Sequence, residues 1–174
     1  SVAAVEGVAD AGALGVLLAT AATGADSFDI AVMGHLPGHA GEPKSLIEGR
    51  RPELGEPFVG LADISLRAKG ISLGDEVTLT GSSHPVEVVG FVKNARYMLA
   101  DTLWVPLEGW KELRFEVRPE TIGLGFVVQA FPILVDEGAD VAAVAAAVDR
   151  ALATTETVTT RQAVLALPGV QPQQ

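Results

Sequence analysis

The stretch 47–92 decides the fold of this chain. In order it contains IEGRRPELGEP (47–57), LADISLRAK (61–69), GISLGDEVTLTG (70–81) and VEVVGFV (86–92). In the second of these segments, Leu61, Ile64 and Ala68 recur at helical spacing, which predicts a short helix with one apolar face. Gly70 follows directly, and glycine readily takes the left-handed conformation at which helices end. We therefore expect this segment to be a helix that stops at Gly70.

The last two segments have the pattern of antiparallel strands. Leu73-Gly74-Asp75 predicts a tight turn, because glycine tolerates a positive φ and aspartate bonds its own backbone. Val77 and Leu79 then alternate with polar side chains, as in a strand with one buried face. The pattern resumes over 86–91 after a turn at 81–85. The whole stretch is predicted to form a strand, a helix and a β-meander.

Taken in this order, the motifs resemble the extracytoplasmic domain of ABC transporter permeases of the FtsX, MacB and DevC type. The segments that carry the resemblance are EGRRP (48–52), the predicted helix (61–69), GISLGDEV (70–77) and VVGFV (88–92). The end of the chain, TTRQA (159–163) and LPGV (167–170), resembles the end of this domain in DevC-like and haem-exporter-like permeases. The resemblance covers nearly the whole chain.

The resemblance implies a role in transport. The domain would lie on the extracytoplasmic face of a bacterial cell membrane, between flanking membrane helices. Through those helices, a permease dimer would work with a separate cytoplasmic ATP-binding cassette subunit. The domain would couple ATP hydrolysis to export or to mechanical work on a substrate or partner. The alternative is a domain that binds a small ligand (haem, a lipid or a peptide) in a groove between two subdomains of an exported or membrane-anchored protein.

Composition limits the other possibilities. The 174 residues carry a formal net charge of −10, which argues against nucleic acid as a partner, because phosphate binding needs a clustered positive surface. The same charge disfavours a domain that lies flat on an anionic membrane. There is no cysteine, so disulfides and thiolate metal sites are excluded. The longest apolar run, 11–22, is shorter than the roughly twenty residues that a membrane helix needs. Since the chain starts at Ser1, we expect it to be an excised piece.

The predicted fold class is α+β. We expect one domain over 1–174, with a porter-like α/β sandwich subdomain formed by 1–44 and 119–174 and an inserted, mostly β subdomain at 45–118. At the start of the chain, strands are predicted at 8–22 and 28–33, which together indicate a hairpin. Toward the other end, the predicted elements are a return linker at 116–125, strands at 125–135 and 157–159, a helix at 141–153, and a last helix that Thr160 caps. Helix remains an alternative for 8–22, which is rich in alanine. The apolar stripe of the 141–153 helix is predicted to be Val141, Ala145, Val148 and Leu152.

Two histidines lie in a loop rich in glycine and proline. His35 and His39, with Met33, could ligate a metal or haem iron through imidazole and thioether groups. Pro37 and Gly38 prevent a regular helix from aligning them, so we expect both imidazoles to be solvated and no metal or cofactor to be bound. His84, in a Ser-Ser-His-Pro turn, is an even weaker candidate.

The aromatic residues allow two interpretations. Trp104 and Trp110, with Tyr97 nearby, could form an exposed patch that meets a partner or substrate. The alternative, which we favour, is that both tryptophans fill the core of a small β unit.

Catalysis has little support in the sequence. No Gly-x-Ser-x-Gly motif and no phosphate-binding Walker loop occurs. Pairs such as Glu108 and Glu112 arise freely in a chain with 22 acidic residues. We expect the chain not to be an enzyme.

Overall fold

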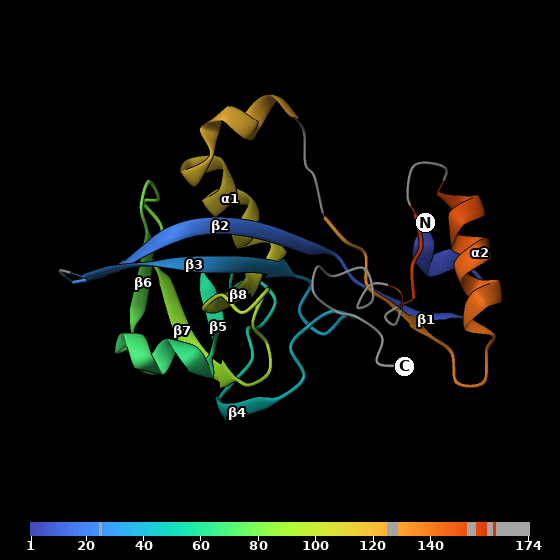
Figure 1. The fold of residues 1–174 in the computed structure, drawn as a ribbon, viewed down its shortest axis with the longest axis horizontal. Helices are drawn as coiled ribbons and strands as arrows, with labels where there is room; N and C mark the ends of the chain where they lie inside the picture. Colours follow the sequence, from blue (N-terminus) through green and yellow to red (C-terminus); the bar gives the residue numbers. More distant parts are fainter. Residues whose placement is uncertain (25, 125–128, 153–155, 160–161, 163–174) are drawn as a thin grey trace, which may run out of the picture. The chain divides into compact units, whose positions relative to one another are not determined.

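The chain is described from a computed structural model, which places residues 1–24, 26–124, 129–152, 156–159 and 162 (Figure 1). These residues form two compact units. The larger is Gly12–Pro132, and the smaller combines Ser1–Ala11 with the chain from Ile133 onward. Both helices and strands are present, and the expected α+β class is confirmed.

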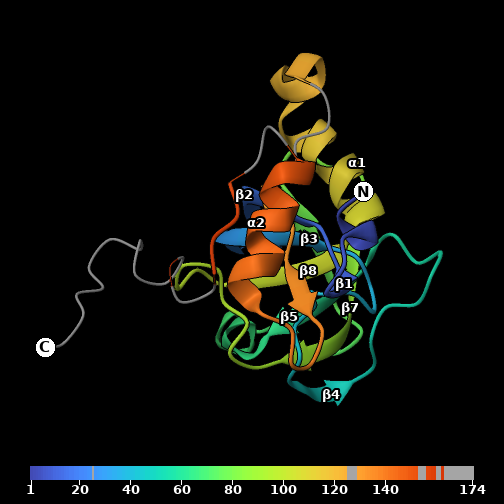
Figure 2. The same ribbon diagram turned by 90° about the vertical axis from the view of Figure 1, so that its right-hand side faces the viewer.

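A seven-stranded sheet forms the framework of the larger unit. Its strands are β2 (Leu14–Thr23), β3 (Asp26–His35), β4 (Leu46–Gly49), β5 (Val59–Asp63), β6 (Glu76–Leu79), β7 (Val86–Val92) and β8 (Thr102–Pro106). Their order is β4-β7-β5-β8-β3-β2-β6, and β6 also pairs with β7. Six strands therefore close into a ring, while β4 lies outside it at the edge beside β7 (Figure 2).

The longest pairing in the sheet is the β2–β3 hairpin, which the sequence predicted. Its antiparallel register runs from Leu14 opposite His35 to Thr23 opposite Asp26. The predicted strand 8–22 is divided, because Gly12 and Ala13 separate β1 from β2. At Gly12 a β-carbon would lie 1.9 Å from the carbonyl oxygen of Ala40, so this close approach of two backbones requires glycine.

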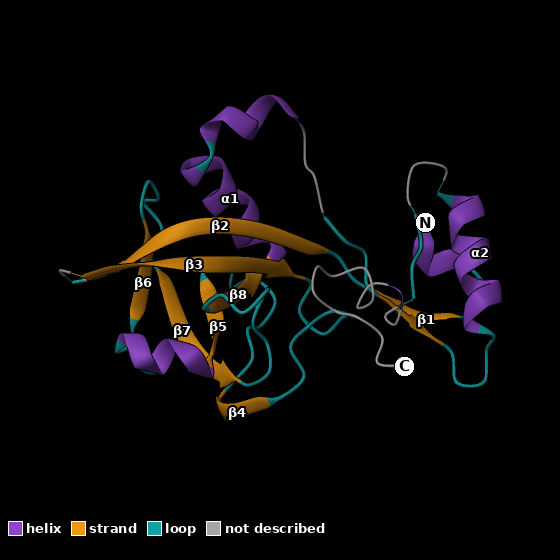
Figure 3. Ribbon diagram, in the orientation of Figure 1, coloured by secondary structure: helices purple, strands orange, loops and turns teal. Residues whose placement is uncertain are grey.

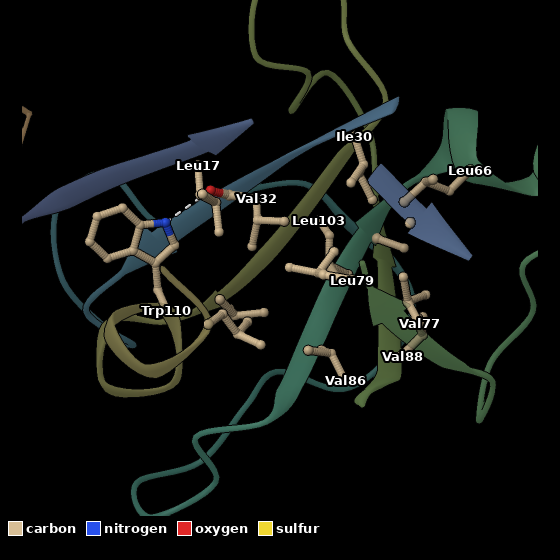
Figure 4. Packing of buried hydrophobic residues seen from close by; sticks show 14 of the residues in the cluster. Leu17, Ile30, Val32, Leu66, Val77, Leu79, Val86, Val88, Leu103 and Trp110 are labelled. Carbon is tan, nitrogen blue, oxygen red and sulfur yellow. Dashed lines mark hydrogen bonds between the residues drawn. The ribbon is translucent and has the colours of Figure 1, made fainter. Parts of the chain in front are cut away.

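The inner face of the ring holds the main core. Strand residues of alternate positions meet there, and they are joined by Leu107, Trp110 and Leu113 from helix α1 (Leu107–Val117) (Figure 4). The indole Nε1 of Trp110 donates to the carbonyl of Val32 at 3.0 Å. Helix α1 thus packs against β2 and β3 (Figure 3). A second cluster, on the other face, contains Met33, Leu61, Val92, Ala95 and Trp104.

Helix α1 and the 3-10 helix η3 (Pro119–Leu124) were not predicted. The sequence interpretation placed a β unit around Trp110 and a linker over 116–125, which is wrong for the part that the structure describes. The missed signal is the spacing of Leu107, Trp110, Leu113 and Val117, which recur every three or four residues.

The helix predicted at 61–69 begins later than expected. Leu61 and Asp63 belong to β5, and the 3-10 helix η2 covers Ile64–Lys69. The carboxylate of Asp63 accepts a hydrogen bond from the amide of Ser65 at 2.9 Å, which starts the helix. Gly70 ends it at φ 81°, as predicted. The tight turn at Gly74 and the strands that follow it are also confirmed.

The smaller unit contains two paired strands and a helix. Its elements are η1 (Val2–Ala4), β1 (Val8–Ala11), β9 (Ile133–Val135) and α2 (Val141–Ala151). Strands β1 and β9 are antiparallel, with Val8 opposite Val135 and Ala11 opposite Ile133. The helix predicted at 141–153 is confirmed, but its buried residues are Val144 and Val148. Val141, a member of the predicted stripe, is 49% exposed, because the helix packs against Gly7 through Val144.

The boundaries of the two observed units differ from those of the two predicted subdomains. The β2–β3 hairpin, assigned to the subdomain of 1–44, pairs with β8 and β6 of the predicted insertion. A shared sheet cannot be divided without breaking backbone hydrogen bonds, so the hairpin belongs to the larger unit. Of the strand predicted at 125–135, residues 125–128 lie outside the described chain. Residues 156–159 contain no strand, and the helix predicted from Thr160 lies largely outside the described residues.

Candidate functional site

The loop between β7 and β8, residues 93–101, is the most unusual surface feature of the larger unit. Two buried contacts fix its base: the amide of Ala95 donates to Asp63 Oδ2 at 3.1 Å, and the indole of Trp104 donates to the carbonyl of Ala95 at 2.8 Å. This loop is called the 93–101 loop below.

The tip of the 93–101 loop exposes two apolar side chains. Met98 is 66% exposed and Leu99 is 81% exposed. Both have positive φ angles, 44° and 67°, a conformation that costs non-glycine residues free energy. The amide of Ala100 donates to the carbonyl of Tyr97 at 2.8 Å, and the guanidinium of Arg96 donates to the carbonyls of Leu99 and Ala100. Local hydrogen bonds therefore hold the strained tip in place.

Charged side chains surround the base of this tip. The carboxylate of Asp101 lies 3.7 Å from Arg96 Nη2 and 3.8 Å from Lys69 Nζ. Lys93 is exposed on the same loop. Lys69 and Arg96 therefore share the carboxylate of Asp101 at the base of the tip.

An open groove of about 420 Å³ begins beside the 93–101 loop. It is lined by Leu18, Ala19, Thr20, Asp29, Ile30, Thr80, Ala100, Val117 and Arg118. Leu18 is 56% exposed, and Arg118 Nη2 donates to its carbonyl at 3.4 Å. Its volume lies in the range of small-ligand sites, although polar side chains interrupt the apolar lining.

The aromatic residues proposed as a surface lie mostly inside the protein. Trp104 is 8% exposed and Trp110 is fully buried, so the two do not form an exposed patch. Instead they pack in the two separate hydrophobic clusters. Tyr97 is half-buried against the cluster that contains Trp104. The interpretation of both tryptophans as core residues is the one that the structure supports.

His35 is not a solvated loop residue, contrary to the sequence interpretation. It is the last residue of β3 and is fully buried. Its ring lies edge-on to Trp104, with the ring centres 6.1 Å apart, and neither ring nitrogen has a hydrogen-bond partner. Burial lowers the pKa of His35 to about 4, because desolvation penalises the charged imidazolium. The nearest carboxylate oxygen, Glu42 Oε1, is 3.9 Å from Nδ1.

The possible ligands Met33, His35 and His39 do not converge. Met33 and His35 are buried on the same face of β3, whereas His39 is exposed in the following loop. Within the described residues, no group of three or more histidine or carboxylate side chains could hold a metal ion. That no metal or cofactor is bound stays a prediction.

A Ser-His-Glu cluster joins the β6–β7 turn to α1. Glu116 accepts hydrogen bonds from Ser82 Oγ at 2.5 Å and Ser83 Oγ at 2.7 Å, and its Oε1 is 3.0 Å from His84 Nδ1. The ring of His84 also stacks on Phe58 at 4.3 Å.

This cluster lacks the geometry of a hydrolase triad. A nucleophilic serine must give its proton to the histidine nitrogen that does not face the carboxylate. Here Ser82 and Ser83 both donate to Glu116 itself, which lowers the pKa of that carboxyl group to about 2. The arrangement therefore fastens the turn to the helix.

Solved structures show a similar fold. No protein-family model matches the sequence, and no curated protein matches it either. The extracellular domain of the noncanonic ABC-type transporter YknZ from Gram-positive bacteria superposes with a TM-score of 0.66 at 21% identity, over 87% of this chain and 78% of that one. The periplasmic region of MacB from Actinobacillus actinomycetemcomitans gives 0.65 at 13% identity, over 96% and 80%.

This chain has the MacB-like periplasmic fold. A domain of a permease protein from Porphyromonas gingivalis is also similar, with a TM-score of 0.57 and 16% identity over 85% of this chain and 63% of that one. At these identities the likeness concerns the fold alone. In the part of the chain that the structure describes, no helix has the length and apolar character needed to cross a bilayer.

Two features of this MacB-like fold were missed at the level of sequence. The sequence gives no sign that Glu116 meets Ser82 and Ser83, which lie more than thirty positions away along the chain. For Met98 and Leu99 a weak signal exists, since two large apolar residues follow directly after the mostly polar segment 93–97.

Proposed function

We propose that this chain is the extracytoplasmic domain of an ABC transporter permease. It would couple ATP hydrolysis by a separate cytoplasmic ATP-binding cassette subunit to export or to mechanical work on a substrate or partner. The MacB-like fold supports the kind of protein. The mechanical role is supported by one observation: the chain enters and leaves the larger unit at adjacent positions.

The larger unit has its two ends side by side. The amide of Gly12 donates to the carbonyl of Pro132 at 2.9 Å. In the smaller unit, the residues just before and just after, Ala11 and Ile133, are partners in the β1–β9 pair. The chain therefore runs out to the larger unit and back again through adjacent strands. We propose that this pair of adjacent chain segments, and not a single linker, transmits motion between the two units.

The larger unit is suited to move as a rigid body. Closure of six strands satisfies backbone groups around the ring, and a buried helix face fills its inner side. The proposed role is non-catalytic and needs no cofactor. By the same proposal the chain lies on the outer face of a bacterial membrane, joined to membrane helices at both ends, in a permease dimer.

The location can be tested because the chain contains no cysteine. In the full-length protein, a Leu54→Cys substitution would place a thiol at a residue that is 94% exposed. We expect a membrane-impermeant maleimide to label it in intact protoplasts. A Val105→Cys variant, at a buried position, serves as the unlabelled control. Labelling of Leu54→Cys only after lysis would contradict the proposed location.

The coupling can be tested by removing the larger unit. Because Ala11 and Ile133 lie opposite each other at the end of the β1–β9 pair, an Asn-Gly hairpin turn can replace residues 12–132 between them. We expect the permease to retain association with its ATPase but to lose export or extracellular work. A Val8→Cys/Val135→Cys pair, at opposite positions of β1 and β9, would report by disulfide formation whether the smaller unit still folds. Unchanged transport in a folded variant would refute the coupling role.

The groove beside the 93–101 loop favours one second candidate, a small-ligand domain. Titration of the isolated chain with haem, short peptides and a fatty acid tests it. A saturable ligand whose binding is lost in a Leu18→Arg variant, which would fill the groove mouth, would support this alternative.

A further inference from the structure

We propose that the outer edge of β2, at residues 15–19, binds an extended peptide segment of a partner protein as an added β-strand. The partner would be recognised through its backbone, by hydrogen bonds to Val16 and Leu18, and through small apolar side chains that enter the groove beside Leu18. The proposal names a ligand for the second candidate function and rests on the same groove, but it does not depend on transport.

The first argument is that β2 is longer than the strand on its outer side. β2 has ten residues, and β3 pairs with all of them. On the other side, β6 pairs only with Ala21 and Ala22, and an isolated bridge joins Leu14 to Ala130. Within the described residues, no strand pairs with the outer edge of 15–19. An unpaired strand edge is a template for another strand.

The second argument is the direction of the backbone groups on this edge. In an antiparallel pair, residues that bond to the neighbouring strand alternate with residues whose backbone groups point away from it. Leu14 exchanges hydrogen bonds with Ala130, so its groups point away from β3. The register of β2 on β3 is unbroken, and the amides and carbonyls of Val16 and Leu18 therefore point outward as well.

The third argument is that side chains occupy the positions where a neighbouring strand would bond. The amide of Val16 donates to Gln129 Oε1 at 2.9 Å, and Gln129 Nε2 donates to the carbonyl of Val16 at 3.4 Å. One side-chain amide thus makes the two hydrogen bonds that a residue of an added strand would make. The carbonyl of Leu18 accepts from Arg118 Nη2 at 3.4 Å, whereas its amide has no partner among the described residues.

A peptide backbone can displace these side chains. Gln129 and Arg118 are both exposed. Two of their three hydrogen bonds to β2 are 3.4 Å long, beyond the usual range of roughly 2.7–3.2 Å, and are therefore weak. An added strand would replace them with backbone bonds of ordinary length and would also satisfy the amide of Leu18. The exchange therefore favours the peptide.

The groove of about 420 Å³ begins at this edge, since Leu18 and Ala19 line it. Leu18 is 56% exposed, and Val117 adds apolar surface to the lining. Side chains of an added strand alternate between its two faces, so every second one would meet this surface. A lipid or haem lacks the alternating amides and carbonyls that a strand edge recognises, and for this reason the peptide is the ligand proposed.

The test follows backbone amides of the ¹⁵N-labelled 174-residue chain by NMR. The probe is an uncharged heptapeptide, acetyl-Ser-Thr-Val-Thr-Val-Thr-Ser-amide. We expect saturable changes at the amides of Val16 and Leu18 as the peptide is added. The same peptide with methylated backbone nitrogens keeps its side chains but cannot donate backbone hydrogen bonds. It should bind at least fivefold more weakly.

Two variants remove the side chains that compete with the peptide. In Gln129→Ala and in Arg118→Ala, we expect binding at least threefold tighter, because the peptide no longer displaces a hydrogen-bonded side chain. A merely structural role of either side chain would not strengthen binding. Arg50→Ala also removes an exposed arginine, one that pairs with Glu56, and is the matched control with unchanged affinity.

A proline at position 18 tests the amide that has no partner. Because this amide points away from β3, Leu18→Pro removes a donor from the edge without removing a hydrogen bond of the hairpin. Binding should fall at least tenfold. Leu18→Ala loses the same side chain but keeps the amide, and it should bind at least threefold more tightly than Leu18→Pro. The spectra without peptide show whether each variant keeps the hairpin.

Several outcomes would overturn the proposal. One is the absence of any change at Val16 and Leu18 in both the wild type and Gln129→Ala; another is equal binding of the methylated peptide. Concentration-dependent changes at these amides without peptide would assign the edge to a second copy of the chain. Haem or a fatty acid that binds in the groove while the peptide does not would overturn this proposal but support the second candidate function. The maleimide test of location is independent of all these results.

Discussion

The indole of Trp110 leaves no room for a side chain at Gly34: a β-carbon there would lie 2.5 Å from Trp110 Cγ. Gly15, directly opposite on β2, is covered by the same ring at 2.5 Å. Because Gly15 and Gly34 have no side chains, Trp110 of α1 can pack directly on the backbone of the hairpin. The hydrogen bond from Trp110 to the carbonyl of Val32 fixes the orientation of the ring.

A Gly34→Ala substitution is predicted to destabilise the larger unit by about 1–3 kcal/mol, the usual cost of overpacking a filled core. Urea unfolding followed by circular dichroism measures it. The same substitution in a Trp110→Leu background should cost much less, because the smaller side chain leaves space. An equal cost in both backgrounds would show that Gly34 is needed for its backbone alone.

Stability is predicted to fall in mild acid because of His35. Its pKa is about 4 in the folded protein and 6.5 in the unfolded chain, so the unfolded state binds more protons between these values. The stability that neutral His35 contributes is therefore fully present above pH 6.5. It declines as the pH falls toward 4, by a total of about 3 kcal/mol. Urea midpoints at pH 4 to 7 measure this slope.

Two glutamine variants separate His35 from other titrating groups. His35→Gln should flatten the pH dependence between 6.5 and 4, whatever it does to absolute stability. His39→Gln, at an exposed position, is the second variant, in which a histidine is also replaced but the imidazole of His35 is kept. A slope that survives in His35→Gln would assign the titration to another group.

The stability contributed by the hydrogen bonds of Glu116 is predicted to be lost at a lower pH than the contribution of His35. The pKa of Glu116 is lowered from 4.5 to about 2, chiefly by the hydroxyls of Ser82 and Ser83. Its stabilisation is thus present above pH 4.5 and lost as the pH falls toward 2. At neutral pH, Glu116→Ala should cost about 1–3 kcal/mol, since the β6–β7 turn loses its charged acceptor.

The exposed neighbour Glu112 gives the control for that measurement. It is on the same helix, and Glu112→Ala should change the unfolding midpoint little. If the two variants lose the same stability, helix propensity or net charge would explain the loss of Glu116 better than the hydrogen bonds do.

The features that the sequence predicted are those determined by neighbouring residues. The β2–β3 hairpin, the left-handed Gly70 and the turn at Gly74 follow from local backbone preferences, and the structure confirms them. Leu61 was misassigned because its apolar spacing fits a helix as well as a buried strand, and only pairing with β7 and β8 decides between them.

Features that depend on distant contacts could not be predicted. His35 is buried because the cluster around Trp104 closes over the end of β3, which no pattern near residue 35 reveals. The strained conformation of Met98 and Leu99 depends in the same way on the Arg96 side chain. Nor could the boundary between the two units be predicted, because it depends on which strands pair across the predicted subdomains.

The helix α2 of the smaller unit provides the last prediction. The carboxylate of Asp140 accepts from the amides of Ala142 at 2.9 Å and Ala143 at 3.3 Å, which satisfies two free donors of the first turn. Asp140→Ala is therefore expected to destabilise the helix by about 0.5–2 kcal/mol. Hydrogen exchange of the amides in α2 measures this locally, and protection should fall there while β2 and β3 keep theirs. Glu137→Ala, at an exposed position outside the helix, should leave the protection of α2 unchanged, so equal losses in the two variants would rule out capping as the cause.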